Sequence, residues 1–233
     1  MIENVDIQGS ITVRANDVTI RNVRVRSGGH FGINVVQGVH GTLIDHVDIQ
    51  MSGDATAAIG GLGDHGGSHS SKPGDNVTVR YSHLHGNGDG IKAVNFGLYE
   101  HNYIHMRRPA GSTRHIDGIQ SSGRSSWTAR YNWVDQAYSG GFNSAIFVQA
   151  YTGSKDVPSK NIIISNNWVN GALYTIQTED GKNGNSGLLR NIQIGNNVFY
   201  RDYKYGVYRP RGDVRGNGGH WADTGRQVPT GTL

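Results

Sequence analysis

The chain has 233 residues, enough for one large domain or two small ones, and its hydrophobic fraction of 35% is too high for general disorder. It contains no cysteine, which excludes disulfides, thiolate metal sites and thiol nucleophiles, whereas its 35 glycines indicate many tight turns. The formal net charge of +4 suits acidic partners such as uronic-acid polymers, but it also fits nucleic acid or no specific partner.

Seven segments along the chain align without gaps, about 20 to 35 residues apart. In chain order they are "VTIRNVRV" from Val18, "TLIDHVDI" from Thr42, "VTVRYSHL" from Val77, "GLYEHNYI" from Gly97, "WTARYNWV" from Trp127, "IIISNNWV" from Ile162 and "IQIGNNVF" from Ile192. Each alternates apolar and polar residues, which is typical of a strand buried on one face.

A second short strand is predicted after each segment. These strands read "FGINVV", "AAIGGL", "DGIKAV", "DGIQSS", "SAIFVQ", "YTIQTE" and "YGVYRP". Strands that recur in one direction must stack in parallel, and no segment shows the apolar period of a helix. We therefore predict one all-β domain over residues 1–233, a single-stranded right-handed parallel β-helix of about 7–8 coils with about 4.8 Å between coils. A β-sandwich is the alternative, but its strands would have no reason to share one template.

The shared template also predicts which side chains stack. The first inward row is Val25, Ile49, Leu84, Ile104, Val134, Val169 and Phe199. The second is Ile33, Ile59, Ile91, Ile119, Ile146, Ile176 and Val207. An asparagine row of Asn102, Asn132, Asn167 and Asn197 should hydrogen-bond the backbone of neighbouring coils as a ladder. An outward row of alternating charge, Arg21, Asp45, Arg80, Glu100 and Arg130, should set the register between coils.

These repeats, the asparagine row and the closing "GNGGHWADTG" resemble the right-handed parallel β-helix superfamily of pectate-lyase-like proteins. The opening "MIENVDIQGSITVRANDVTIRN" looks like a phrase found in uncharacterised β-helix proteins of actinobacteria and their phages. The resemblance covers nearly the whole chain and implies a polysaccharide-facing protein. It implies no single activity, because the superfamily includes lyases, epimerases, hydrolases and inert phage tail parts.

No catalytic residue is transferred from that superfamily. The multi-Asp pattern of polygalacturonases, with its Gly-His-Gly and Arg-Ile-Lys, is absent, and so is the Asp-Pro-His motif of alginate epimerases. The resemblance implies an extracellular, secreted or virion-associated protein. Residues 1–20 lack the pattern of a signal peptide, so a signal outside this chain or another export route is expected. The first coil begins almost at residue 1, which predicts a missing N-terminal cap or a truncated relative, and hence a homo-oligomer or a capping partner.

The phrase Asp-Gly-Ile occurs twice, in "HGNGDGIKAV" and "RHIDGIQSSG". In register, Asp89 should lie below Asp117, roughly 5 Å apart by the strand spacing. Two carboxylates this close can act as acid and base, share a proton or bind a cation such as Ca²⁺. The catalytic candidates are Asp89, Lys92, His115 and Asp117, of which Lys92 or His115 would act as the proton acceptor in lyase or epimerase chemistry. The alternative is that the Asp-Gly pairs are ordinary turn residues that cap loop amides.

Further residues are candidates for substrate binding. The register predicts Asn87 below His115 and Lys92 below Gln120. Lys92 and Arg114 would neutralise a substrate carboxylate, and Arg107 and Arg108 would add positive charge to the groove. Long inserts at residues 60–76, 106–117, 136–144 and 151–161 are candidate walls of this site.

Outward aromatic residues should lie on successive coils: His83, Tyr103, Trp133 and Trp168. The last three would stack on sugar faces, or else lie buried under long loops. His85, His105 and Asp135 form a parallel outward row that could ligate a metal such as Zn²⁺.

Two functional hypotheses remain open. The first is an enzyme that processes an acidic polysaccharide or cell-surface glycan by elimination, epimerisation or hydrolysis. The second is a non-catalytic β-helix for adhesion or assembly, such as a phage minor tail or receptor-binding protein. Nucleic acid is not an expected partner, because the basic residues are scattered and no DNA- or RNA-binding motif is present. No apolar run is long enough to span a membrane.

Overall fold

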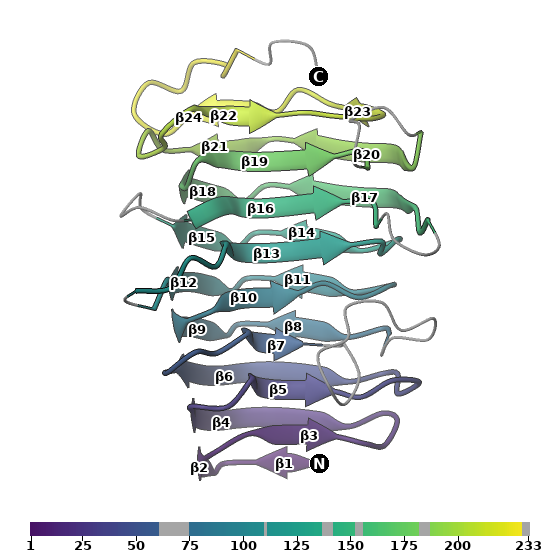
Figure 1. Ribbon diagram of the computed structural model, residues 1–233, viewed down its shortest axis with the longest axis vertical. Coiled ribbons are helices and arrows are strands. Elements are labelled where there is room, and N and C mark those ends of the chain that lie inside the picture. The colour runs from purple at the N-terminus through teal and green to yellow at the C-terminus, as the bar shows by residue number, and fades with distance from the viewer. Residues whose placement is uncertain (61–74, 110, 137–141, 152–155, 182–186, 230–233) are drawn as a thin grey trace.

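The computed structural model describes residues 1–60, 75–109, 111–136, 142–151, 156–181 and 187–229, which form strands and turns with no helix in these ranges. None of these segments is therefore a helix that could cross a membrane. The strands pair in parallel from coil to coil, and the first and last coils lie at opposite ends of the solenoid (Figure 1). The predicted right-handed parallel β-helix is confirmed.

The smaller sheet has eight strands, one from each coil. They are β3 (Ile11–Val13), β5 (Phe31–Val35), β7 (Ala57–Gly60), β10 (Asp89–Lys92), β13 (Ile116–Ser122), β16 (Phe142–Gln149), β19 (Tyr174–Glu179) and β22 (Gly206–Arg209).

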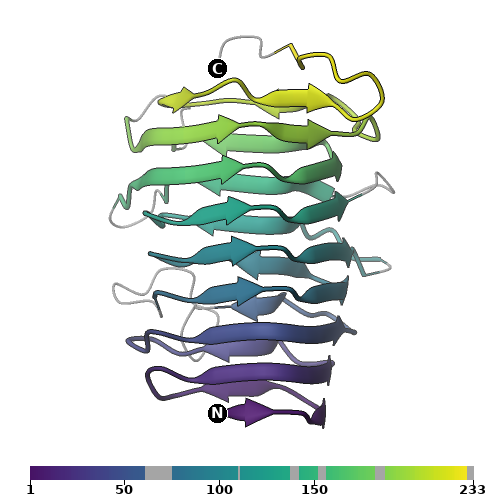
Figure 2. The ribbon, with the colours of Figure 1, turned by 180° about the vertical axis from the view of Figure 1, so that it is seen from behind.

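The larger sheet has sixteen strands and divides in two after the first coils, because β6 (Leu43–Met51) pairs with two different strands of the next coil. Below β6 lie β1 (Ile2–Glu3), β2 (Asp6–Gln8) and β4 (Thr19–Ser27). One branch is β8 (Thr78–Arg80), β11 (Leu98–Glu100), β14 (Thr128–Arg130), β17 (Ser159–Ser165), β20 (Leu189–Gly195) and β23 (Val214–Arg215). The other is β9 (His83–Asn87), β12 (Tyr103–Arg107), β15 (Trp133–Gln136), β18 (Trp168–Gly171), β21 (Asn197–Phe199) and β24 (Gly219–Trp221). Figure 2 shows this sheet from outside.

A bend between the two branches is made by one left-handed residue per coil. These residues are Asn22, His46, Tyr81, His101, Tyr131, Asn166 and Asn196, with φ between 50° and 58°. The left-handed conformation costs a non-glycine residue about 1–2 kcal/mol, so the bend needs compensating interactions.

The asparagine row supplies that compensation, and the predicted ladder is confirmed. Asn102, Asn132, Asn167 and Asn197 follow the bend directly, and each side-chain oxygen accepts the backbone N–H of the coil below at 3.0–3.1 Å. Each side-chain nitrogen donates to a backbone carbonyl at 2.9–3.1 Å. All four side chains are buried, so the ladder satisfies backbone groups that water does not reach.

The first inward row pairs position by position from Val25 to Phe199, and every member is fully buried. The second row is confirmed from Ile33 to Ile176. The prediction for the last member of this row is wrong, because Ile176 pairs with Tyr208 and not with Val207. The Tyr208 ring packs edge-on against Phe199 with centroids 5.0 Å apart, which seats a larger apolar group at this end of the core.

The outward charge row also forms as predicted. Asp45 accepts hydrogen bonds from Arg21 Nε at 3.0 Å and from Arg80 Nη2 at 3.3 Å. Burial raises the pKa of Asp45, but the hydrogen bonds from Arg80, His46 and Arg21 outweigh it and hold the pKa below its usual value. A slip by one coil would place like charges together, so the row favours the observed register.

Candidate functional site

Aromatic side chains form two neighbouring columns on the larger sheet. The bend column consists of the left-handed residues His46, Tyr81, His101 and Tyr131, whose successive ring centroids are 5.0–5.1 Å apart. The strand column consists of His83, Tyr103, Trp133 and Trp168, which pair in register as predicted. Because coils repeat about every 4.8 Å, equivalent rings on successive coils come within stacking distance.

The bend column was not predicted, although its signal is present in the aligned template. The fifth letter of "TLIDHVDI", "VTVRYSHL", "GLYEHNYI" and "WTARYNWV" is aromatic in each case. Bulky residues are rare at positive φ, so an aromatic residue in this conformation indicates a stabilising tertiary contact. Here the stacking of each ring on the next supplies one.

A groove of about 580 Å³ lies between the columns. It is lined by Tyr81, His101, Asn102, Tyr103, Tyr131, Trp133, Trp168 and Tyr200. The exposed fractions of Trp133, Trp168 and Tyr103 are 50%, 43% and 39%, so these rings are not buried under a loop. Exposed aromatic rings that meet at one groove form a surface suited to a ligand with apolar faces.

The described residues that line the groove carry no acidic side chain. The groove's lining among the described residues includes no lysine or arginine either. The guanidinium groups of Arg80 and Arg130 lie 5.9 Å from the ring centroids of Tyr81 and Tyr131, but they are paired with Asp45 and Glu100. Burial raises the pKa of Tyr103, and the nearby Asp135 adds to this, so its hydroxyl stays protonated and can donate a hydrogen bond.

The repeated Asp-Gly phrase lies on the smaller sheet, and the structure brings its polar residues together. Lys92 pairs with Gln120 in register, as predicted, and its ammonium contacts both Gln120 and Asp89. Asp89 Oδ1 accepts the backbone N–H of Asp117 at 2.7 Å, and Asp117 Oδ1 accepts that of Ser144 at 2.8 Å. The aspartates therefore form a second ladder between coils.

Burial limits what this cluster can contact. Asp89 is 3% exposed and Asp117 is 0% exposed, whereas the Lys92 side chain keeps 16% of its surface exposed. A substrate that reached either carboxylate would have to displace the surrounding chain. The geometry matches the turn-and-ladder alternative more closely than an open catalytic pair.

The other predicted binding residues are dispersed. Asn87 does not lie below His115: it pairs with Arg107 at the end of β12 and donates to the carbonyl of Gly53 at 2.8 Å. The reason is that β9 continues through Asn87 before the chain turns the corner, whereas His115 lies just before the smaller sheet. His115, Arg107 and Arg108 are exposed.

Arg114 is paired with an acidic residue outside the Asp-Gly cluster, since its Nη1 lies 3.0 Å from Asp54 Oδ1. Of the four inserts expected to form walls, residues 61–74, 110, 137–141 and 152–155 lie outside the described residues.

The predicted metal row keeps its register, since His105 pairs with His85, but its three side chains are not a converging group among the described residues. His105 Nδ1 donates to the Asp135 carbonyl at 3.0 Å, and Asp135 Oδ1 accepts from Asn170 at 3.0 Å. Among the described residues, the one group of three potential ligands that converge is Asp48, His83 and His85. Burial lowers the pKa of His83, and the neighbouring His85 adds to this, while Asp48 opposes both. Asp48 was missed, although the aligned template places it in register with His83.

Comparisons with known proteins support the fold. No protein-family model and no curated protein matches the chain. Among solved structures, the A-module of the Azotobacter vinelandii mannuronan C-5 epimerase AlgE6 is similar, with a TM-score of 0.71 over 94% of this chain and 12% sequence identity. The chain spans 55% of the length of that protein. At this identity the likeness shows a shared fold.

Proposed function

We propose that the protein binds a polysaccharide in the groove between the bend column and the strand column, with the glycan chain running across successive coils. The observation that carries this proposal is the pair of parallel columns of exposed rings with one groove between them. Sugar rings have apolar faces that pack on aromatic rings, and a repeating polymer suits a surface that repeats with every coil.

Two further observations support this choice of ligand. The fold is shared with a module of a protein whose name gives mannuronan, a polymer, as its substrate. The net charge of +4 would attract an acidic polymer, and the exposed Arg107 and Arg108 contribute to it. A mannuronan-type acidic glycan is therefore the first ligand to test. Such a role would place the protein outside the cell or on a virion.

We expect Trp133→Ala and Trp168→Ala each to weaken glycan binding about tenfold or more. Truncating an aromatic anchor at the centre of a binding surface costs about 2 kcal/mol or more, which exceeds the roughly 1.4 kcal/mol that corresponds to a tenfold change in affinity. Binding is measured by the quenching of tryptophan fluorescence on a panel of mannuronan, polygalacturonate and neutral polysaccharides, and by calorimetry for the variants.

The matched control is Phe96→Ala, which removes another exposed aromatic ring that does not line the groove. Its affinity should equal that of the wild type. Equal weakening by Phe96→Ala and Trp168→Ala, or no binding to any polysaccharide in the panel, would contradict the proposal.

Whether the protein also modifies the bound glycan is tested by substitutions in the Asp-Gly cluster. We expect Asp89→Asn and Asp117→Asn to leave glycan binding intact. For Asp117→Asn the loss of stability should be below about 1 kcal/mol, because the asparagine oxygen can still accept the Ser144 N–H. Thermal melting and assays for unsaturated products and new reducing ends provide the readout.

If the wild type converts a polysaccharide and both variants lose turnover while their melting temperatures hold or rise, the aspartates are catalytic. Lys92→Ala should then lose turnover as well, since neutralising a substrate carboxylate needs the charge in place. If the wild type binds without any conversion, the adhesive or assembly function is supported.

A further inference from the structure

We propose that Asp48, His83 and His85 form a binding site for a divalent transition-metal ion such as Zn²⁺, at the end of the strand column that His83 begins. This inference does not depend on the proposed glycan binding. It also differs from the set expected from sequence, which combined His85 with His105 and Asp135.

Strand geometry brings the three side chains together. His83 and His85 are two residues apart on β9, so both project from the same face of the sheet. Asp48 is the register partner of His83 on the adjacent β6. The two imidazole rings stack with centroids 4.3 Å apart, and each has one nitrogen beside the same oxygen of Asp48.

The distances suit a tetrahedral ion. Asp48 Oδ1 lies 3.2 Å from His83 Nδ1 and 3.1 Å from His85 Nε2, and the three ligand atoms all lie within 4.8 Å of one another. Zinc bonds of about 2.0–2.1 Å set the ligand-to-ligand distance in a tetrahedron at about 3.3–3.4 Å. The planes of the two imidazoles are only 14° apart in the stack, so both rings must turn out of the stack for their nitrogen lone pairs to point at one ion beside Asp48 Oδ1.

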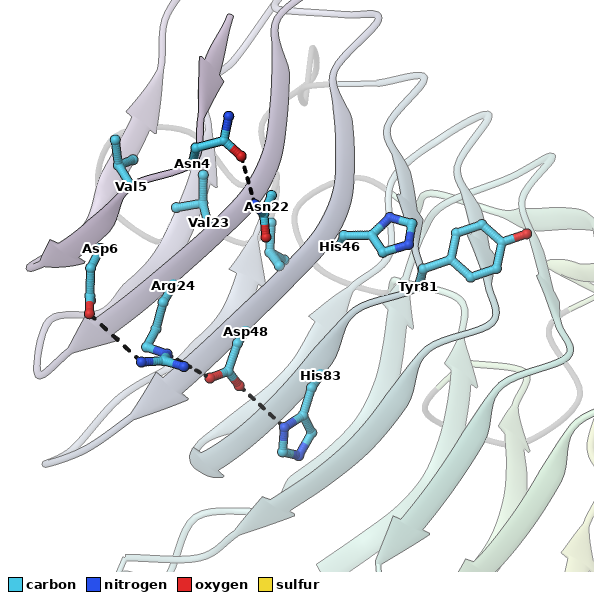
Figure 3. A pocket seen from close by; sticks show the side chains of 11 residues that line it. Asn4, Val5, Asp6, Asn22, Val23, Arg24, His46, Asp48, Tyr81 and His83 are labelled. Carbon is cyan, nitrogen blue, oxygen red and sulfur yellow. Dashed lines mark hydrogen bonds and ion pairs between the residues drawn. The ribbon is translucent and has the colours of Figure 1, made fainter.

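The carboxylate is oriented by a second interaction. Arg24 Nε donates to Asp48 Oδ2 at 3.3 Å, and Arg24 Nη1 lies 3.8 Å from Asp6 Oδ2. Figure 3 shows the series of contacts that runs from Asp6 through Arg24 and Asp48 to His83. Because Arg24 bonds to Oδ2, the other oxygen is left facing the imidazoles, an outer-shell arrangement common around metal-binding carboxylates.

The ligand set favours a particular class of ion and leaves the ion accessible. Two imidazoles and one carboxylate suit Zn²⁺ and similar ions, whereas Ca²⁺ takes six to eight oxygen ligands. Asp48 and His83 line a cavity of about 560 Å³, so a fourth position would open onto solvent. Three protein ligands with one open position is the pattern of sites where a metal contacts water or a substrate.

The test is a titration of the protein without a polyhistidine tag, using Zn²⁺ in calorimetry and Co²⁺ in visible absorption, which reports four- or five-coordination. We expect one equivalent to bind. His83→Ala and Asp48→Asn should weaken the affinity by more than the roughly 10- to 100-fold that loss of an outer-shell partner causes. The matched controls are His105→Ala and Asp135→Asn, on the two following coils, which should retain the wild-type affinity. Thermal melts confirm that each variant is folded.

Two results would overturn the proposal. One is the absence of stoichiometric binding of either ion to the wild-type protein. The other is a loss of affinity in His105→Ala and Asp135→Asn with none in His83→Ala, which would assign the ion to the set expected from sequence.

Discussion

Replacing Ile119 with aspartate should abolish cooperative folding of the solenoid. Ile119 is fully buried and pairs with Ile91 below and Ile146 above. The substitution removes a large apolar side chain, which costs about 2–5 kcal/mol, and buries a carboxyl group without a partner, which adds to that cost. We expect a total of about 5 kcal/mol or more, comparable to the whole stability of many domains. The measurement is chemical denaturation followed by circular dichroism.

The adjacent residue provides the control. Gln120 lies on the outer side of the same strand, beside Lys92, so Gln120→Asp places the same carboxyl group next to a cation. This variant should unfold cooperatively with near-wild-type stability. A soluble Ile119→Asp protein with a sharp transition would mean that the inward row is misassigned.

Asn132→Ala should destabilise the protein by about 2–6 kcal/mol, because it removes one member of the ladder at the bend. Asn132 Oδ1 accepts the Asn102 backbone N–H at 3.1 Å, and its Nδ2 donates to the Tyr99 carbonyl at 2.9 Å. Alanine leaves both buried backbone groups without these partners, and each such loss costs about 1–3 kcal/mol. Urea denaturation gives the change in unfolding free energy directly.

The comparison variant is Asn87→Ala, which removes a single exposed hydrogen bond to the Gly53 carbonyl. It should cost no more than about 1 kcal/mol. If Asn132→Ala were as mild as Asn87→Ala, the ladder would not compensate for the left-handed bend, and another interaction would have to do so.

The solenoid and its inner rows could be predicted because each coil repeats one pattern. Once the eight-residue segments are aligned, the strand period of two decides which side chains face inward, and parallel stacking decides which ones meet. The inward row from Val25 to Phe199 and the asparagine row therefore followed directly from the alignment.

The errors arose where the chain turns between sheets, because the alignment says nothing about where a strand ends. Asn87 was paired with His115 because both precede an Asp-Gly phrase, but β9 runs on through Asn87 before the corner. The predicted pairing of Val207 with Ile176 was wrong by one residue. Val207 lies in the last strand of the smaller sheet, so no following coil helps to fix its register.

The candidate site was only partly predictable. The strand column followed from the register, but the bend column depends on a backbone conformation that aromatic residues rarely adopt. Asp48 is absent from the predicted metal set because that set follows the single outward row through His85, whereas Asp48 lies in the neighbouring row, in register with His83, and contacts both imidazoles. The burial of Asp89 and Asp117 depends on how the corner packs, which spacing along the chain does not reveal.

Hydroxyl-radical footprinting with and without each polysaccharide of a panel, read out by mass spectrometry, shows whether a glycan occupies the groove between the two aromatic columns. Tyr81, Tyr131, Trp133 and Trp168 are all at least 42% exposed, so each should be oxidised readily in the free protein. With a bound polysaccharide, we predict that all four are protected together, while the exposed Phe96, outside the groove, is oxidised as before. Protection of Phe96 to the same degree, or four unprotected groove residues with every polysaccharide, would mean that the groove is not a glycan-binding site.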